Sequence, residues 1–174
     1  RGNRPPRFYP NSRLARSLSS VAEMIRGGLK TRVYFVSLGG FDTHSNQGNR
    51  QPALLRELSG ALAAFQRDLE ASRLDDQVLT MTFSEFGRRP TENESQGTDH
   101  GTAAPLFVMG SKVGQPLIGE APSLDLPKNG DLRFETDFRS VYASVLEDWL
   151  GCEATSVLGQ SYPKLPLLAK DAPT

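Results

Sequence analysis

The sequence contains few of the residues that cross-link small proteins through disulfides or bound metal ions. Among its 174 residues there is one cysteine, Cys152, so an internal disulfide and a cysteine-based zinc site are both excluded, and inert packing is its expected role. With two histidines, any metal centre would also need carboxylate ligands. No apolar run approaches the roughly 20 residues that span a bilayer. The content of 37% hydrophobic and 23% charged residues is typical of a globular domain.

Several motifs of common enzyme classes are missing as well. Gly39-Gly40 lacks the third glycine of a dinucleotide-binding fingerprint, and there is no phosphate-binding loop with a Gly-Lys-Ser/Thr ending. No Gly-x-Ser-x-Gly elbow marks a serine hydrolase. Thr43 and Ser84 are the hydroxyls best placed to act as nucleophiles, but structural hydrogen bonds are the expected role of both.

The net charge is zero, but the charges are unevenly distributed. Residues 1–32 carry eight basic side chains against one acidic side chain, Glu23, and the rest of the chain is acidic. We interpret this segment as a solvated basic arm that lies against an acidic body. The chain begins at Arg1 without an initiator methionine or a signal peptide, which suggests a piece of something longer.

Apolar residues recur at helical spacing in three segments. Asn11 or Ser12 would cap the first segment, and Gly27-Gly28 would stop it. Pro52 fits the first turn of the second segment. The predicted helices run from Ser12 to Arg26, from Gln51 to Ser72, and from Thr136 or Asp137 to Leu150.

Three apolar segments are predicted to be strands covered on both faces, which is typical of a parallel sheet: Arg32–Leu38, Gln77–Phe83 and Pro105–Met109. The order of these elements predicts an α/β fold, a single domain over residues 1–174 with a mainly parallel sheet sandwiched by helices. Outside them we expect a Gly-rich loop at 39–49, a polar loop at 84–104, an extended lead-in at 1–11, a tight turn at Asn129-Gly130, and a tail at 151–174 that wraps the domain.

Candidate ligands cluster around these strands. Ligands of open α/β sheets bind beyond the carboxyl ends of the strands. Asp42 and His44 follow the first predicted strand, Glu85 follows the second, and Asp99 and His100 precede the third. Carboxylates and imidazoles are ligands of zinc, manganese and iron. These five side chains would serve one or two ions and leave a position for water or a substrate oxygen.

Each candidate also has an ordinary structural interpretation. Asp42 and His44 could form an Asx turn with a surface histidine, and Glu85 or Asp99 could cap a turn. Arginines such as Arg88 are more often solvated or paired with carboxylates than bound to substrate. The position of both histidines at the predicted rim nevertheless favours a metal or anion site.

Five long strings resemble one bacterial domain-of-unknown-function family (number fifteen-oh-one): Y-P-N-S-R-L-A-R-S-L, V-S-L-G-G-F-D-T-H-S-N-Q, L-T-M-T-F-S-E-F-G-R-R, G-T-D-H-G-T-A-A-P-L-F-V-M-G and T-D-F-R-S-V-Y-A-S-V-L-E-D-W-L-G. The resemblance runs from about Tyr9 to Leu168 and is to the C-terminal part of the family's domain. That family is similar to sulfatases and belongs with the alkaline phosphatase-like superfamily.

The resemblance implies a phosphatase- or sulfatase-like α/β/α sandwich that lacks its N-terminal strand, and an exported or periplasmic protein. It also implies that the first metal-binding aspartate and the nucleophile lie upstream of this chain. On the same pattern, a divalent metal, zinc or manganese, would be bound or supported by Asp42, His44, Glu85, Asp99 and His100.

We therefore predict a metal-dependent hydrolase-like domain that acts on small-molecule or polymer phosphate or sulfate esters, with Arg88 steadying the substrate oxyanion. Phe86 occupies a position where related sites place a second ligand, so a second hypothesis is a non-catalytic exported binding module. Nucleic-acid binding by the basic arm is disfavoured because its arginines alternate with prolines and lack interleaved aromatic residues.

Overall fold

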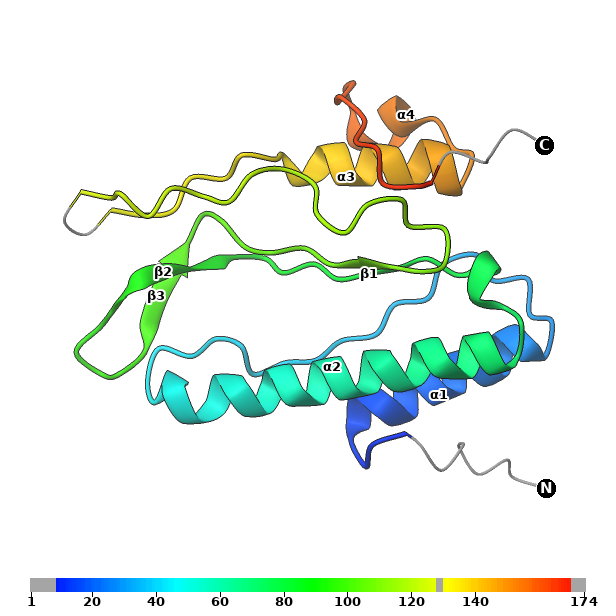
Figure 1. Cartoon of the computed structure of the whole chain (residues 1–174), viewed down its shortest axis with the longest axis horizontal. Helices are drawn as coiled ribbons and strands as arrows, with labels where there is room; N and C mark the ends of the chain where they lie inside the picture. The colour runs from blue at the N-terminus through cyan, green and yellow to red at the C-terminus, as the bar shows by residue number, and fades with distance from the viewer. Residues whose placement is uncertain (1–8, 128–129, 170–174) are drawn as a thin grey trace. The chain divides into compact units, whose positions relative to one another are not determined.

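The computed structural model describes residues 9–127 and 130–169, which form two compact units (Figure 1). Unit 1 comprises the described residues up to Val78 together with Thr91–Asp99, and unit 2 comprises Leu79–Pro90 and the described residues from His100 onward. Most of the predicted lead-in, with three arginines of the basic arm, and Asn129 of the predicted turn lie outside the described residues. Within these, no helix has the length and apolar character needed to cross a bilayer.

Helix α1 of unit 1 covers Arg13–Arg26, which confirms the first predicted helix. The Ser12 hydroxyl accepts a hydrogen bond from the Ala15 amide at 3.1 Å and caps the first turn. The helix ends at Arg26, and Gly27 is its C-cap, in agreement with the predicted stop. Its apolar face is buried and includes Leu14, Leu18 and Val21.

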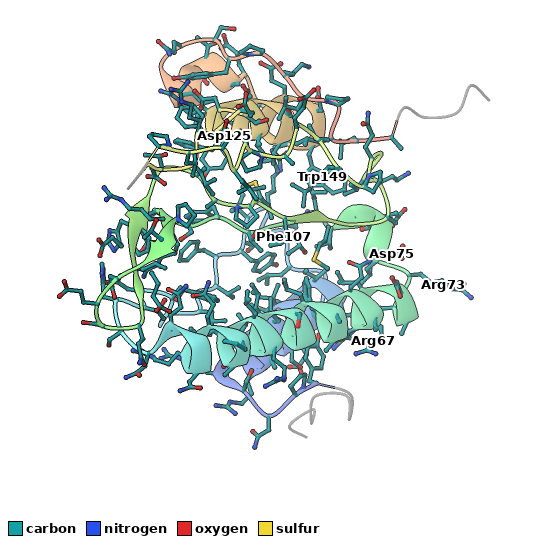
Figure 2. The ribbon with its side chains drawn as sticks, turned by 60° about the vertical axis from the view of Figure 1, so that its left-hand side comes forward. Arg67, Arg73, Asp75, Phe107, Asp125 and Trp149 are labelled. Atoms are coloured by element: carbon teal, nitrogen blue, oxygen red, sulfur yellow. The ribbon has the colours of Figure 1, made fainter. Side chains whose placement is uncertain are left out.

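Helix α2 covers Gln47–Ala71 and begins earlier than the predicted start at Gln51. Pro52 consequently lies inside the helix rather than in its first turn. The two helices pack together around a core to which α2 contributes Ala61, Phe65 and Leu69 (Figure 1). Polar side chains occupy the solvent side of α2, such as the exposed Arg67 (Figure 2).

The segment Arg32–Leu38 is extended but forms no strand. Tyr34, Val36 and Leu38 pack against the helical core, whereas Val33 and Phe35 are 68% and 73% exposed. The alternation shows that one face of the segment is covered, not both. The predicted strand covered on both faces is therefore wrong.

The predicted strands of unit 2 are short and antiparallel. Strand β1 (Thr80–Met81) pairs with β4 (Val108–Met109), with Thr80 opposite Met109. Beyond this pair, the Thr82 amide donates to the Phe107 carbonyl at 2.9 Å. Just before β1, the chain forms a short 3₁₀ turn, η1 (Asp75–Gln77), so the strand predicted from Gln77 begins at Thr80.

A hairpin occupies the segment predicted to be a loop at 84–104. Strands β2 (Gly87–Glu92) and β3 (Thr98–Gly101) form the second two-stranded sheet. Asn93 closes the turn: its amide donates to the Gly97 carbonyl at 2.8 Å. Its side-chain oxygen accepts from the amides of Ser95 and Gly97 at 3.0 Å each.

The last predicted helix is confirmed as α3 (Phe138–Ser144), which continues into a π-helical turn, η2 (Val145–Trp149). Asp137 caps α3 by accepting from the Arg139 amide at 2.9 Å. A further helix, α4 (Ala154–Leu158), lies in the region predicted to be a tail. The buried Ser144 hydroxyl accepts from the Leu165 amide at 2.8 Å and so fixes the described part of this region to α3.

The predicted α/β sandwich of the alkaline phosphatase/sulfatase type is contradicted. The described residues form four α-helices and two small antiparallel sheets, and they contain no parallel pair of strands. The physical reason is that β-branched, apolar segments favour extended backbone, whereas a sheet also requires a partner for the backbone groups. In these segments, only Thr80–Met81 and Val108–Met109 form paired strands.

Candidate metal site

The loop that carries Asp42 and His44 is anchored by the residue between them. Thr43 is fully buried, and its hydroxyl donates to the side-chain oxygen of Gln47 at 2.8 Å. The same oxygen accepts from the hydroxyl of Thr98, in strand β3, at 2.7 Å. Because Thr43 points inward, its two neighbours on the loop are directed toward solvent.

The tip of the β2–β3 hairpin is joined to this loop by backbone hydrogen bonds. The Asn46 and Gln47 amides donate to the carbonyls of Ser95 and Gln96, at 3.1 and 2.9 Å. Gly97 makes the close approach possible, because a β-carbon at this position would collide with the backbone of His44. The loop and the hairpin tip (Thr91–Asp99) therefore form one hydrogen-bonded assembly within unit 1.

His44 lies between two carboxylates of this assembly. Its Nε2 is 3.0 Å from Oδ1 of Asp42, and its Nδ1 is 3.5 Å from Oδ1 of Asp99. Asn93 supports the arrangement through its side-chain nitrogen, which donates to the His44 carbonyl at 3.1 Å and to Asp99 Oδ1 at 3.4 Å. The three ionisable side chains are about half exposed, at 48%, 59% and 57% for His44, Asp42 and Asp99.

The donor set fits a divalent cation. Two ligands that are each about 2.1 Å from one zinc ion lie about 3.0–3.4 Å apart. The 3.0 Å separation of Asp42 Oδ1 and His44 Nε2 agrees with this range. Asp99 Oδ1 faces the other ring nitrogen, Nδ1, at 3.5 Å, and a carboxylate on that side of the ring favours the tautomer that leaves the Nε2 lone pair for a metal.

Both histidines take part in the same candidate group. Asp42, His44 and His100 are exposed and offer one ligand atom each in a group that could hold a metal ion. His100 follows Asp99 directly in strand β3. Of the predicted ligands, Asp42 and His44 thus lie on one loop and Asp99 and His100 lie in one strand, and their roles as ligands stay predictions.

The other predicted site residues have different surroundings. Glu85 is exposed, accepts a hydrogen bond from the Ser84 hydroxyl at 3.4 Å, and is not a member of the ligand group found among the described residues. Arg88 is half-buried, with its guanidinium 5.0 Å from the ring centre of Phe86. Arg89 is exposed on β2. The roles predicted for Glu85 and Arg88 stay predictions.

Unit 2 also contains an apolar pocket of about 590 Å³, which is distinct from this site. Its walls include Leu106, Leu117, Phe134 and Phe138, and none of the predicted ligands lines it. The predicted ligands therefore lie outside this pocket.

Sequence reasoning missed the residues that hold the ligands in place. Asn93, Gly97, Gln47 and Thr98 position the loop and the hairpin, but none of them carries a charge or a typical ligand atom. The N-E-S-Q-G run at 93–97 contains the signal that could have found the turn, because asparagine and glycine in that spacing favour a hairpin connection.

The described fold and this group together define a mixed helical and antiparallel-sheet protein with an exposed carboxylate–imidazole site. The chain belongs to the family described as proteins of unknown function (DUF1501), whose model matches residues 22–138. This range contains every predicted site residue, and it confirms the family part of the resemblance. Comparison with curated proteins and with solved structures gives no match.

Proposed function

We propose that the chain is a metal-dependent hydrolase-like domain that acts on phosphate or sulfate esters. The observation that carries the proposal is the His44 imidazole, which has Asp42 at one ring nitrogen and Asp99 at the other. The loop of His44 is held by a buried threonine and by the hairpin tip, unlike an unsupported surface loop. The hydrogen-bonded assembly around Thr43 and Asn93 supports a binding role instead.

The proposed roles of the side chains follow from their positions. Asp42, His44 and His100 supply the ligand atoms, and Asp99 orients His44 through Nδ1. Asn93 holds Asp99 and the His44 carbonyl at the same time. Two imidazoles with one carboxylate favour zinc, and manganese is the second choice because of the additional oxygen donors nearby.

The exposure of the group suits reaction with an external ester. A bound zinc or manganese ion would polarise an ester oxygen and lower the pKa of a coordinated water. The three ligand residues are exposed, which suits small-molecule as well as polymer esters. We assign Arg88 to the ester oxyanion and Glu85 to support of the metal or of the attacking water, and the family resemblance adds export to the proposal.

A second candidate, a non-catalytic binding module, is favoured by one observation. Two hydroxyls beside the ligands in unit 1, those of Thr43 and Thr98, are both buried and hydrogen-bonded to Gln47. Neither is available to attack an ester. Turnover would therefore need water or another hydroxyl as the nucleophile, and without one the site would only bind.

Calorimetric titration with Zn²⁺ and Mn²⁺ tests metal binding. We expect one equivalent to bind to the wild-type chain, and we expect His44→Ala or His100→Ala to weaken binding by at least about 100-fold. Asp99→Asn should weaken it by about 10- to 100-fold, as is typical of groups that orient a ligand. Asp76→Ala, which removes an exposed carboxylate outside the group, is the matched control and should have no effect.

Turnover separates the two candidate functions. The metal-loaded protein is assayed with aryl phosphate and aryl sulfate, and hydrolysis that His100→Ala abolishes supports the hydrolase. If the protein is saturated with metal and hydrolyses neither ester, the result supports the binding module. A wild-type chain that binds neither ion contradicts both.

A further inference from the structure

Phe86 and His100 stack face to face in unit 2. Their ring centres are 3.7 Å apart, and their planes differ by 9°. Phe86 directly precedes strand β2, and His100 is in strand β3 of the same sheet. Glycines let the strands approach closely at this point: a β-carbon on Gly101 would lie 2.7 Å from the carbonyl carbon of Arg88, and one on Gly87 would collide with the backbone of Ala103.

Phe86 is itself held by a second neighbour. The guanidinium carbon of Arg88 is 5.0 Å from the centre of the Phe86 ring, which is within the range of a cation–π contact. Phe86 and Arg88 are both half-buried, whereas His100 is exposed. The aromatic ring is thus the fixed partner of the stack, and the imidazole is the side chain that it restrains.

A stack of this kind leaves the ligand atoms of a histidine accessible. The nitrogen lone pairs of imidazole lie in the ring plane, whereas stacking uses the ring face. An exposed histidine without such a contact samples several rotamers. Contact with Phe86 limits the rotation of the His100 side chain and covers one face of its imidazole ring. Both ring nitrogens lie at the edge of the ring, which the stack does not cover.

We propose that Phe86 is a positioning residue that fixes the His100 imidazole for metal binding. The inference rests on the proposed function and deepens it, because it assigns a role to the position where a ligand was expected from the resemblance. Phe86 contributes no ligand atom. It reduces the side-chain entropy that His100 loses when it binds an ion.

The test compares Zn²⁺ affinity among variants of the full chain. Phe86→Leu keeps an apolar side chain but removes the aromatic face, and it should weaken binding by about 3- to 10-fold, the cost of one newly freed side chain. Phe86→Tyr keeps the ring and should restore the wild-type affinity. Phe138→Leu is the matched control, because Phe138 also contacts an aromatic ring and an arginine, Tyr142 and Arg139, away from either histidine.

A measurement without metal tests the stack directly. The ring protons of His100 should be shifted upfield by the Phe86 ring current in the wild-type protein and in Phe86→Tyr, and the shift should be lost in Phe86→Leu. This readout also shows whether the variant is folded, since the remaining resonances should not move.

The outcomes separate the inference from the proposed function. If the wild-type chain binds zinc and Phe86→Leu binds it equally well, the positioning role is wrong and the metal site stands. If Phe86→Tyr fails to restore affinity, the aromatic face is not what matters, and the inference is again overturned. If the wild-type chain binds no zinc, the proposed metal site fails, and the positioning role fails with it.

Discussion

Asp68 is a charged residue within the helical core of unit 1, where it is 3% exposed. Its two carboxylate oxygens are occupied: the Tyr9 hydroxyl donates to one at 3.0 Å, and the Arg26 guanidinium donates to the other at 2.5 Å. A buried carboxylate destabilises a fold unless such partners compensate for its lost hydration. This cluster therefore ties Tyr9 and the last turn of α1 to α2.

The Tyr9 hydroxyl makes the stability of unit 1 depend on pH in the alkaline range. Burial, together with the hydrogen bond to Asp68 and the charge of that carboxylate, raises the pKa of Tyr9 well above its ordinary value. The unfolded chain releases this proton at about pH 10, whereas the folded chain retains it. The stabilisation is fully present below about pH 10 and is lost as the pH rises above that value.

The corresponding prediction concerns Tyr9→Phe, which lacks the ionisable group. In urea titrations from pH 8 to pH 11.5, the free energy of unfolding should fall more steeply for the wild-type chain than for the variant. At pH 8 the variant should be less stable by about 1 kcal/mol, the usual value of one lost hydrogen bond. If the free energies of unfolding of the wild-type chain and the variant fall in parallel above pH 10, folding does not raise the pKa of Tyr9.

At the scale of elements, the hairpin tip determines the geometry of the metal ligands. It brings Asp99 to His44 and anchors the loop through backbone hydrogen bonds from Asn46 and Gln47. Gly97 is the critical position, since its lack of a side chain lets the tip contact the His44 backbone. The metal affinity of the proposed site thus depends on Gly97, a residue without a functional group.

Gly97→Ala should therefore impair the site while the helices persist. The added methyl group must displace backbone atoms of His44, so we expect zinc affinity to fall at least about tenfold and the helical circular dichroism signal to be retained. The control is Gly48→Ala in α2, where a β-carbon meets nothing within 4 Å and alanine favours the helix. Equal zinc affinity for the wild-type and Gly97→Ala chains would rule out the hairpin as the support of His44.

The helices could be predicted from the sequence because their signals are local. Apolar spacing together with the caps at Ser12 and Asp137 gave α1 and α3 to within a residue or two at their starts. The start of α2 was less accurate, because Asn46 adopts a left-handed conformation with φ of 49° and provides no side-chain cap. Position-specific backbone conformations of this kind leave little trace in the sequence.

The strands could not be predicted, because their pairing is not local. The apolar run Arg32–Leu38 indicates extended backbone, which is correct, but it says nothing about which segment pairs with it. The hairpin of β2 and β3 was missed for the opposite reason: its strands G-R-R-P-T-E and T-D-H-G are polar and partly exposed. Their formation depends on the turn at Asn93, not on hydrophobicity.

At the scale of the whole molecule, the fold from which the site was argued is contradicted, whereas the roles predicted for the site residues stay predictions. Asp42, His44, Asp99 and His100 were selected on the assumption of a parallel sheet edge, which the structure contradicts. Asp42 and His44 lie on a Gly-rich loop, and Asp99 and His100 lie in strand β3 after a polar turn; Gly-rich and polar segments form turns where short carboxylate and imidazole side chains are exposed. The prediction of a single domain is not settled by the division into two units.

The imidazole resonances of the two histidines provide the most direct test of the metal site, because the chain contains no other histidine. Zn²⁺ is titrated into the ¹⁵N-labelled chain while the ring nitrogens are observed by NMR. We predict that the signals of His44 and His100 change together, that both changes are complete at one equivalent, and that His44→Ala abolishes the response of His100. If one ring responds without the other, or neither responds in excess zinc, the two histidines do not share an ion and the proposed site is wrong.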